Sequence, residues 1–341
     1  MGRDSERVSK VMVRISSLSE RPEQHRPRRL ADWLNPTGER KVHSLVDKIY
    51  QRKNLEVAWE KVKRNRGVGG IDGEDLVAFE AELGANLERL HQELKDGTYT
   101  PQPVLEHRIP KAGKPGKYRT LGIPTIYDRV CQQAILNRLE PIFDPVFDEA
   151  NFGYRSGRST KDALKKVWQE LRQGNEWVVD ADLKDFFGSI DHDKLLTLVN
   201  QRVSDGRVLG LIKQILKAGC VAAGKRLATE EGASQGGVIS PLLSNILLTP
   251  FDREMRRKGY RVTRYADDCV PRRRTGGRSP PCSYAALEMR EGPSEPPFRW
   301  RLQTTVSCVG KEPICSNATL VEMRNKNNKP RISKFFLFCL S

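Results

Sequence analysis

The sequence lacks any apolar run close to the roughly 18 residues that a membrane-spanning helix needs. Its first 29 residues are charged and hold no apolar core of the kind that a secretory signal peptide carries. Residues 1–40 as a whole are polar and rich in arginine and proline, without sustained periodicity. We therefore expect a cytoplasmic protein with no membrane partner, in which residues 1–40 form a disordered basic leader.

The 7 cysteines lack the paired Cys-x-x-Cys spacing of a zinc site, and they suggest no disulfide framework. Reduced thiols are the ordinary state of cysteines in a cytosolic protein. The cysteines therefore supply no predicted metal ligand.

Acidic residues are also comparatively few, because 43 Asp and Glu face 59 Lys and Arg, which gives a net charge of +16. A strongly basic chain predicts a polyanionic partner, and nucleic acid is the first candidate. The 341 residues are enough for one large domain or two ordinary ones with an ample core.

One acidic stretch, Tyr265-Ala266-Asp267-Asp268, lies between two strand-like segments. Residues 260–264 alternate bulky and polar side chains, and a return strand is predicted from Cys269. Adjacent strand residues point to opposite faces, so both carboxylates reach one metal cluster only if the backbone turns there. Taken alone, an Asp-Asp pair is most often just a turn.

A second acidic stretch, residues 177–187, is an apolar strand that runs into carboxylates and then into two aromatic residues. Asp182 alone is ordinarily a helix cap or a turn residue. Acids at the ends of two buried strands would repel each other, and divalent cations remove that conflict. Two-metal phosphoryl transfer needs such a cluster. We therefore favour a metal site that joins Asp182 to Asp267 and Asp268.

The remaining pattern is mostly helical. Helices are predicted within residues 42–63, 76–94, 128–139, 159–171, 193–203 and 208–217, and strands within 104–109 and 118–123. The turn between those two strands is rich in lysine, so Lys111 and Arg119 could hold a triphosphate by charge and bidentate hydrogen bonds. The glycine-rich residues 67–73 lack the Lys-Ser/Thr ending of a P-loop and are predicted to be a connector.

Several segments occur in an order that is typical of one family. They are Tyr118–Pro124, Phe152–Ser159, Asp180–His192, Gly232–Leu243 and Tyr265–Asp268. Together they resemble the motifs of bacterial group II intron-encoded reverse transcriptases of the maturase type, and the resemblance extends over residues 45–270.

The resemblance implies an α+β fold of the right-hand polymerase type, with an antiparallel palm sheet backed by helices. Residues 41–175 would form the fingers and residues 176–270 the palm. The implied activity is that of an RNA-directed DNA polymerase, which extends a DNA primer on an RNA template from deoxynucleoside triphosphates. Such proteins also bind their intron RNA and assist its splicing.

The resemblance also assigns roles to residues. Asp182 and Asp267 would bridge two Mg²⁺ ions, with Asp268 beside the metals and the carbonyl of Leu183 as a further ligand. The nucleotide would meet Lys111, Arg119, Phe187 and Gln235, with Phe187 selecting deoxyribose. The template would meet Arg155, Arg158, Gly236 and Gly237, and the glycines let a backbone approach a flat ligand closely.

The chain departs from this family after Val270. Pro271 cannot donate to a strand ladder, so we expect the return strand to stop there. Residues 271–341 contain no Asp, yet they hold 8 of the 20 prolines and 4 of the 7 cysteines, with no strand or helix period before residue 335. We interpret residues 271–341 as an aberrant, disordered tail from out-of-frame translation; a genuine but divergent tail is the alternative. The thumb would then be missing or disordered, and polymerase activity impaired.

Two other functions stay open at this point. The first is a non-catalytic RNA-binding module, either a splicing helper or a remnant of a maturase. The second is a related reverse transcriptase from a retron, a diversity-generating element or a defence system. Residues 235–241, Gln-Gly-Gly-Val-Ile-Ser-Pro, fit the intron group better. The sequence leaves the oligomeric state open.

Overall fold

A computed structural model describes residues 41–110, 116, 118–173, 177–183, 186–222, 224–273 and 302–308, with the backbone alone for 177–183, 273 and 302–308. All of them belong to one compact unit, Lys41–Ser341. The predicted leader, Lys111 and most of the predicted aberrant tail lie outside the described residues.

The first part of the unit is helical, as predicted, but in shorter pieces. The segment predicted as one helix over residues 42–63 is α3 (Val46–Ile49) and α4 (Arg52–Arg64), and the next is α5 (Leu76–Ala81) and α6 (Leu83–Asp96). Asp75 caps α5 by accepting from the backbone N–H groups of Val77 and Ala78. Gly97 ends α6 in the left-handed conformation that glycine adopts at low cost.

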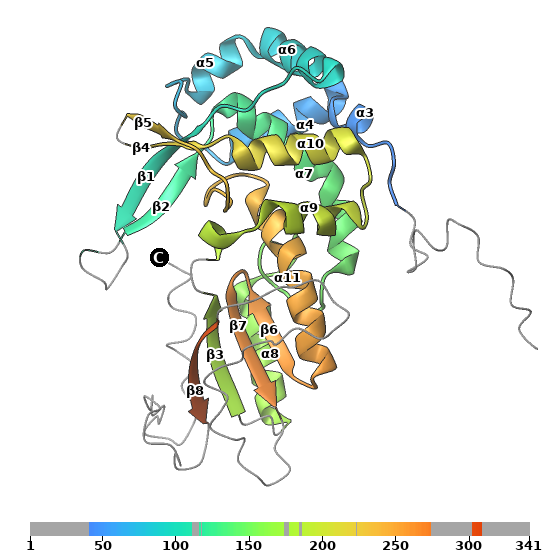
Figure 1. Ribbon diagram of the computed structural model, residues 1–341, viewed down its shortest axis with the longest axis vertical. Helices are drawn as coiled ribbons and strands as arrows, with labels where there is room; N and C mark the ends of the chain where they lie inside the picture. Colours follow the sequence, from blue (N-terminus) through green and yellow to red (C-terminus); the bar gives the residue numbers. More distant parts are fainter. Residues whose placement is uncertain are drawn as a thin grey trace, which may run out of the picture. The chain divides into compact units, whose positions relative to one another are not determined.

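The first sheet has the strand order β2-β1-β4-β5 (Figure 1). Strands β1 (Val104–Pro110) and β2 (Tyr118–Ile123) form the predicted antiparallel hairpin. Strand β4 (Cys220–Ala222) pairs with β1 in parallel and with β5 (Lys225–Leu227) in antiparallel fashion. The last two strands were not predicted, because three residues are too few to show a period. This sheet draws strands from both sides of the predicted boundary at residues 175/176.

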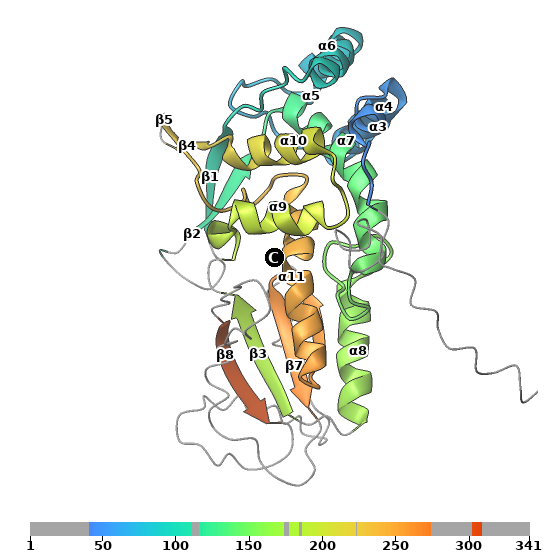
Figure 2. The same cartoon turned by 45° about the vertical axis from the view of Figure 1, so that its right-hand side comes forward.

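The second sheet is wholly antiparallel, with the order β6-β7-β3-β8. Its strands are β3 (Trp177–Leu183), β6 (Arg261–Tyr265), β7 (Asp268–Arg273) and β8 (Leu302–Cys308). Helices α8 (Thr160–Arg172) and α11 (Ser240–Arg257) both pack against β6. Figure 2 shows the two helices beside the end of this sheet that carries β7. Helices and an antiparallel sheet backed by helices confirm the α+β prediction.

The prediction that the return strand stops at Pro271 was wrong. Strand β7 continues to Arg273, and Pro271 lies opposite Val262 of β6. Proline lacks the N–H that would donate to a neighbouring strand, and the ladder affected is the one to β3, on the side of β7 away from β6. There, β3 and β7 pair at both ends in one register, while Val179 and Asp180 have no β7 partner within the described backbone. Strand β8 was also not expected, and it pairs with every residue of β3.

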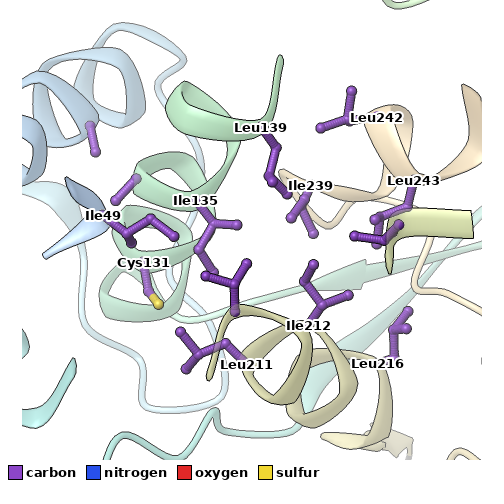
Figure 3. Packing of buried hydrophobic residues seen from close by; sticks show 14 of the residues in the cluster. Ile49, Cys131, Ile135, Leu139, Leu211, Ile212, Leu216, Ile239, Leu242 and Leu243 are labelled. Carbon is purple, nitrogen blue, oxygen red and sulfur yellow. The ribbon is translucent and has the colours of Figure 1, made fainter. Parts of the chain in front are cut away.

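The core lies where three further helices meet α11. These are α7 (Ile126–Phe143), which runs into the 3₁₀ turn η1 (Asp144–Val146), α9 (His192–Asn200) and α10 (Gly206–Lys217). Figure 3 shows the fully buried Ile135, Ile212 and Leu243 converging from α7, α10 and α11. Each such side chain stabilises the fold by about 1.5–3 kcal/mol. Pro241 lies in the first turn of α11, where its missing N–H costs no helical hydrogen bond. Within the described residues, no helix combines the length and apolar character that a membrane span requires.

Candidate active site

The Asp-Asp pair lies at a tight hairpin between β6 and β7. Tyr265 pairs with Asp268, so only Ala266 and Asp267 form the turn. Ala266 has φ +60°, in the left-handed region that glycine adopts more readily than alanine. Ala266 is buried, Asp267 is half-buried and Asp268 is exposed. The backbone therefore turns at this pair, which is the condition that both carboxylates need to reach one site.

Strand β3 brings the other acidic stretch to this turn. The register pairs Asp182 with Asp268 of β7 and with Gln303 of β8, so Tyr265, Asp268, Asp182 and Gln303 form one row across the sheet. Residues directly opposite each other in an antiparallel pair have Cβ atoms about 4.5–5.5 Å apart. The two acidic stretches, 85 positions apart at Asp182 and Asp267, thus meet at one end of the second sheet.

The donor set at this end suits magnesium, because Mg²⁺ prefers oxygen ligands and uses one or two carboxylates at most sites. No group of three His, Cys, Asp or Glu side chains is arranged to hold a metal among the described side chains. The side chains of Asp182 and its neighbour Leu183 lie outside them. On register and ligand chemistry, the residues present fit a magnesium site.

Two of the predicted nucleotide contacts are tied to one loop. Phe187 lies in the short 3₁₀ helix η2 (Phe187–Ser189), half-buried and edge-on to the buried Phe186, with ring centroids 5.2 Å apart. Its carbonyl accepts from the N–H of Ala233 at 2.8 Å, two residues before Gln235. The structure therefore places Phe187 and Gln235 on neighbouring backbone segments.

The same loop holds the end of β2, the strand of Arg119. The carbonyl of Gln235 accepts from the N–H of Gly122 at 2.6 Å. Gly236 has φ +110°, and a Cβ there would lie 2.6 Å from the Gly122 carbonyl oxygen. The close approach that Gly236 permits is thus to the backbone of β2. Arg119 itself is exposed.

The chain matches the reverse transcriptase (RNA-dependent DNA polymerase) family over residues 109–271. It is also 39% identical over 199 residues to the group II intron-encoded protein LtrA of Lactococcus lactis subsp. cremoris, a match that covers 58% of this chain and 32% of LtrA. The chain carries a reverse transcriptase domain over residues 109–271, and it is similar to a protein of the group II intron type.

Two other proteins resemble this chain. Protein YkfC of Escherichia coli (strain K12) is 36% identical over 237 residues, which cover 68% of this chain and 62% of YkfC. A solved structure, a partial Cas6-RT-Cas1–Cas2 complex, aligns with a TM-score of 0.47 at 23% identity and covers 68% of this chain and 39% of the other. The chain thus spans less than two thirds of the length of either relative, 62% of YkfC and 32% of LtrA.

The two arginines predicted to contact template lie differently in the reverse transcriptase domain. Arg155 is buried, and its guanidinium donates to the Asp144 carboxylate at 2.6 Å and to backbone carbonyls, including that of Asp148 at 2.8 Å. Arg158 is half-buried, donates to the carbonyl of Asn151 at 3.2 Å and lies over the ring of Phe152. Arg155 therefore shapes the loop from within, and Arg158 is the better placed of the two to meet a ligand.

Sequence reasoning missed the polar residues behind the hairpin of the reverse transcriptase domain. Arg264, Asp252 and Asn245 are buried, and Arg264 forms an ion pair with Asp252 at 2.7 Å. Burial raises the pKa of the Asp252 carboxyl, and the charge of Arg264 opposes that rise. The only sequence signal for them is an arginine within a predicted strand. This signal is weak, because such an arginine can equally lie on the solvent-exposed face.

Proposed function

We propose that this chain is a cytoplasmic RNA-directed DNA polymerase of the group II intron type. It adds deoxynucleotides to the 3′-hydroxyl of a DNA primer on an RNA template, and it also binds intron RNA. The observation that carries the proposal is the register that sets Asp182 opposite Asp268, beside the two-residue turn with Asp267. The net charge of +16 supports an RNA partner.

In this proposal, Asp182 and Asp267 hold two Mg²⁺ ions, with Asp268 beside them and the carbonyl of Leu183 as a further ligand. When bound, such a pair activates the attacking hydroxyl oxygen and stabilises the leaving group of the incoming nucleotide. The protein contributes negative charge and fixed ligand positions. The pairing of Tyr265 with Asp268 closes the turn and so fixes the backbone that carries Asp267 and Asp268.

The nucleotide contacts follow from the loop that carries Gln235. Phe187 excludes a 2′-hydroxyl from the sugar site, and Gln235 lies near that sugar. Arg119, with Lys111, holds the triphosphate from the β1–β2 hairpin. The template rests on Arg158 and on the backbone at Gly236 and Gly237, with Arg155 supporting the loop before α8.

The test measures addition of a single nucleotide to a primer on an RNA template, with protein in excess and Mg²⁺ present. Single addition does not depend on holding the primer through many cycles. Asp267→Asn keeps the side-chain shape and removes the charge. Losing several kcal/mol of metal-dependent stabilisation should slow addition roughly 100-fold or more.

Asp193→Asn is the matched control, since Asp193 is an exposed acid on α9, paired with Lys213 at 3.5 Å. It should leave the rate unchanged, and both variants should keep their RNA affinity. A wild-type chain that binds RNA but adds no nucleotide at any Mg²⁺ concentration would instead support the non-catalytic RNA-binding module.

A further inference from the structure

Arg264 is one of the most deeply buried charged residues in the second sheet, with 1% of its surface exposed. Its Nε and Nη2 donate to the two carboxylate oxygens of Asp252 on α11, at 2.9 and 2.7 Å. A charge is buried at high cost unless it is paired and fully hydrogen-bonded. Asp252 accepts hydrogen bonds from two of the three guanidinium nitrogens, and the third nitrogen makes a different contact.

That third nitrogen, Nη1, donates to the carbonyl oxygen of Ala266 at 2.9 Å. Ala266 is the first residue of the hairpin turn and is held at φ +60°, a conformation that persists in a non-glycine residue only when its surroundings enforce it. The carbonyl of Ala266 belongs to the peptide that leads into Asp267. Arg264 therefore holds the peptide on which the position of Asp267 depends.

Asn245 of α11 extends this contact to a second loop. Its Oδ1 accepts from Arg264 Nη1 at 2.9 Å, and its Nδ2 donates to the carbonyl of Gly153 at 2.9 Å. Gly153 packs on the turn so closely that a Cβ there would lie 2.1 Å from the nitrogen of Ala266. The turn is thus held between the guanidinium and the loop at Gly153.

We propose that Arg264 is a positioning residue: its guanidinium spans Asp252 and the carbonyl of Ala266, and so fixes the hairpin turn that presents Asp267. The catalytic part of this inference rests on the function proposed above. Lysine is a poor substitute, because a single ammonium lacks the planar fork that reaches a carboxylate and a carbonyl in different directions.

Arg272 provides a matched control in the same sheet. It is also 1% exposed, and it pairs with Glu170 of α8 at 2.9 Å and donates to Thr263. Its described bonds all lie away from the turn. Arg264→Lys and Arg272→Lys therefore both loosen a buried ion pair and should lower the melting temperature by similar amounts, but only the first removes a bond to the turn.

The first measurement is the maximal rate of single-nucleotide addition with saturating RNA–primer and nucleotide, well below both melting temperatures. Arg264→Lys should lower that rate roughly 10- to 100-fold, because a displacement of about 1 Å at a reacting group has such an effect. Its affinity for the RNA–primer should be unchanged. Arg272→Lys should stay close to wild type. Equal losses in the two variants, or none in Arg264→Lys, would overturn the catalytic part.

The second measurement does not need activity. Hydrogen–deuterium exchange of the peptide covering residues 265–269 should accelerate at least 10-fold in Arg264→Lys and stay at the wild-type rate in Arg272→Lys. Unchanged exchange in Arg264→Lys would refute the positioning role, whatever the rates are. If the wild-type chain adds no nucleotide, the proposed function fails, while the exchange still decides whether Arg264 holds the turn.

Discussion

The two sheets of this protein are built on different principles. In the second sheet, Val262, Thr263, Arg264 and Val270 are all buried, and two arginines are anchored to helices by ion pairs. In the first sheet, β5 and the hairpin end of β1 and β2 are exposed, including large apolar side chains at Ile109, Tyr118 and Leu227. The buried second sheet can therefore keep the residues at its end in fixed positions. The first sheet exposes a surface, and the end of β2 is held by the hydrogen bond between Gly122 and Gln235.

Breaking the buried pair between Arg272 and Glu170 tests this contrast most strongly. Arg272→Met removes the guanidinium and leaves the Glu170 carboxylate buried without it. Loss of one partner of a buried ion pair costs about 3–5 kcal/mol. We expect the free energy of unfolding, measured by urea denaturation, to fall by that amount.

Replacing both residues, Arg272→Met with Glu170→Met, tests whether the loss of stability comes from the carboxylate left buried without its partner. No charge is then left buried, so we expect the double variant to recover a large part of the loss. If Arg272→Met alone changes the unfolding free energy by less than about 1 kcal/mol, the second sheet does not depend on its buried charges.

Strands β3 and β6 and helix α8 were predictable from the sequence, whereas the buried ion pairs that anchor the second sheet were not. The alternation in residues 260–264 predicts β6, because one face of a strand repeats every two residues. The partner of Arg264 is Asp252, in a helix whose pattern gives no hint of a buried acid. Partners set by tertiary packing leave no period in the sequence.

At Pro271, a correct local rule led to a wrong prediction of where the strand ends. Its missing N–H was correctly seen as incompatible with a continuous ladder, but the consequence was assigned to the strand's length. The strand instead continues to Arg273, and the ladder to β3 is interrupted at Val179 and Asp180. Which of its two neighbours a strand fails to pair with depends on its place in the sheet, and the local sequence does not contain that information.

A middle-sized effect is expected at Asp205, which anchors the start of the described chain to α10. Its carboxylate accepts from four backbone N–H groups, those of Leu45 and Val46 at 2.7 and 2.9 Å and those of Arg207 and Val208. Burial opposes ionisation, but these four bonds together hold the pKa of Asp205 below its ordinary value. Asp205→Asn should lower the free energy of unfolding by about 2 kcal/mol at neutral pH.

The pH dependence of that loss has a definite sign. A carboxyl whose pKa is lower in the folded state stabilises the fold above the unfolded pKa of about 3.9, and this contribution disappears as the pH falls through the folded pKa. The difference between wild type and Asp205→Asn should therefore be full at about pH 6 and shrink below about pH 4. A difference that grows on acidification would contradict the role given to the ionised carboxylate.

The smallest effect is expected in the first sheet, at the pair between Arg108 and Glu106 of β1. Arg108 Nε lies 3.0 Å from a carboxylate oxygen of Glu106, nearly the same as the 2.9 Å between Arg272 and Glu170. The difference is that the Arg108 side chain is 70% exposed. Water already solvates that guanidinium, so an exposed pair contributes about 0.5 kcal/mol or less. Arg108→Ala should leave urea denaturation nearly unchanged, and 0.5 M salt should erase any difference. A loss comparable to that of Arg272→Met would mean that burial is not what separates the two sheets.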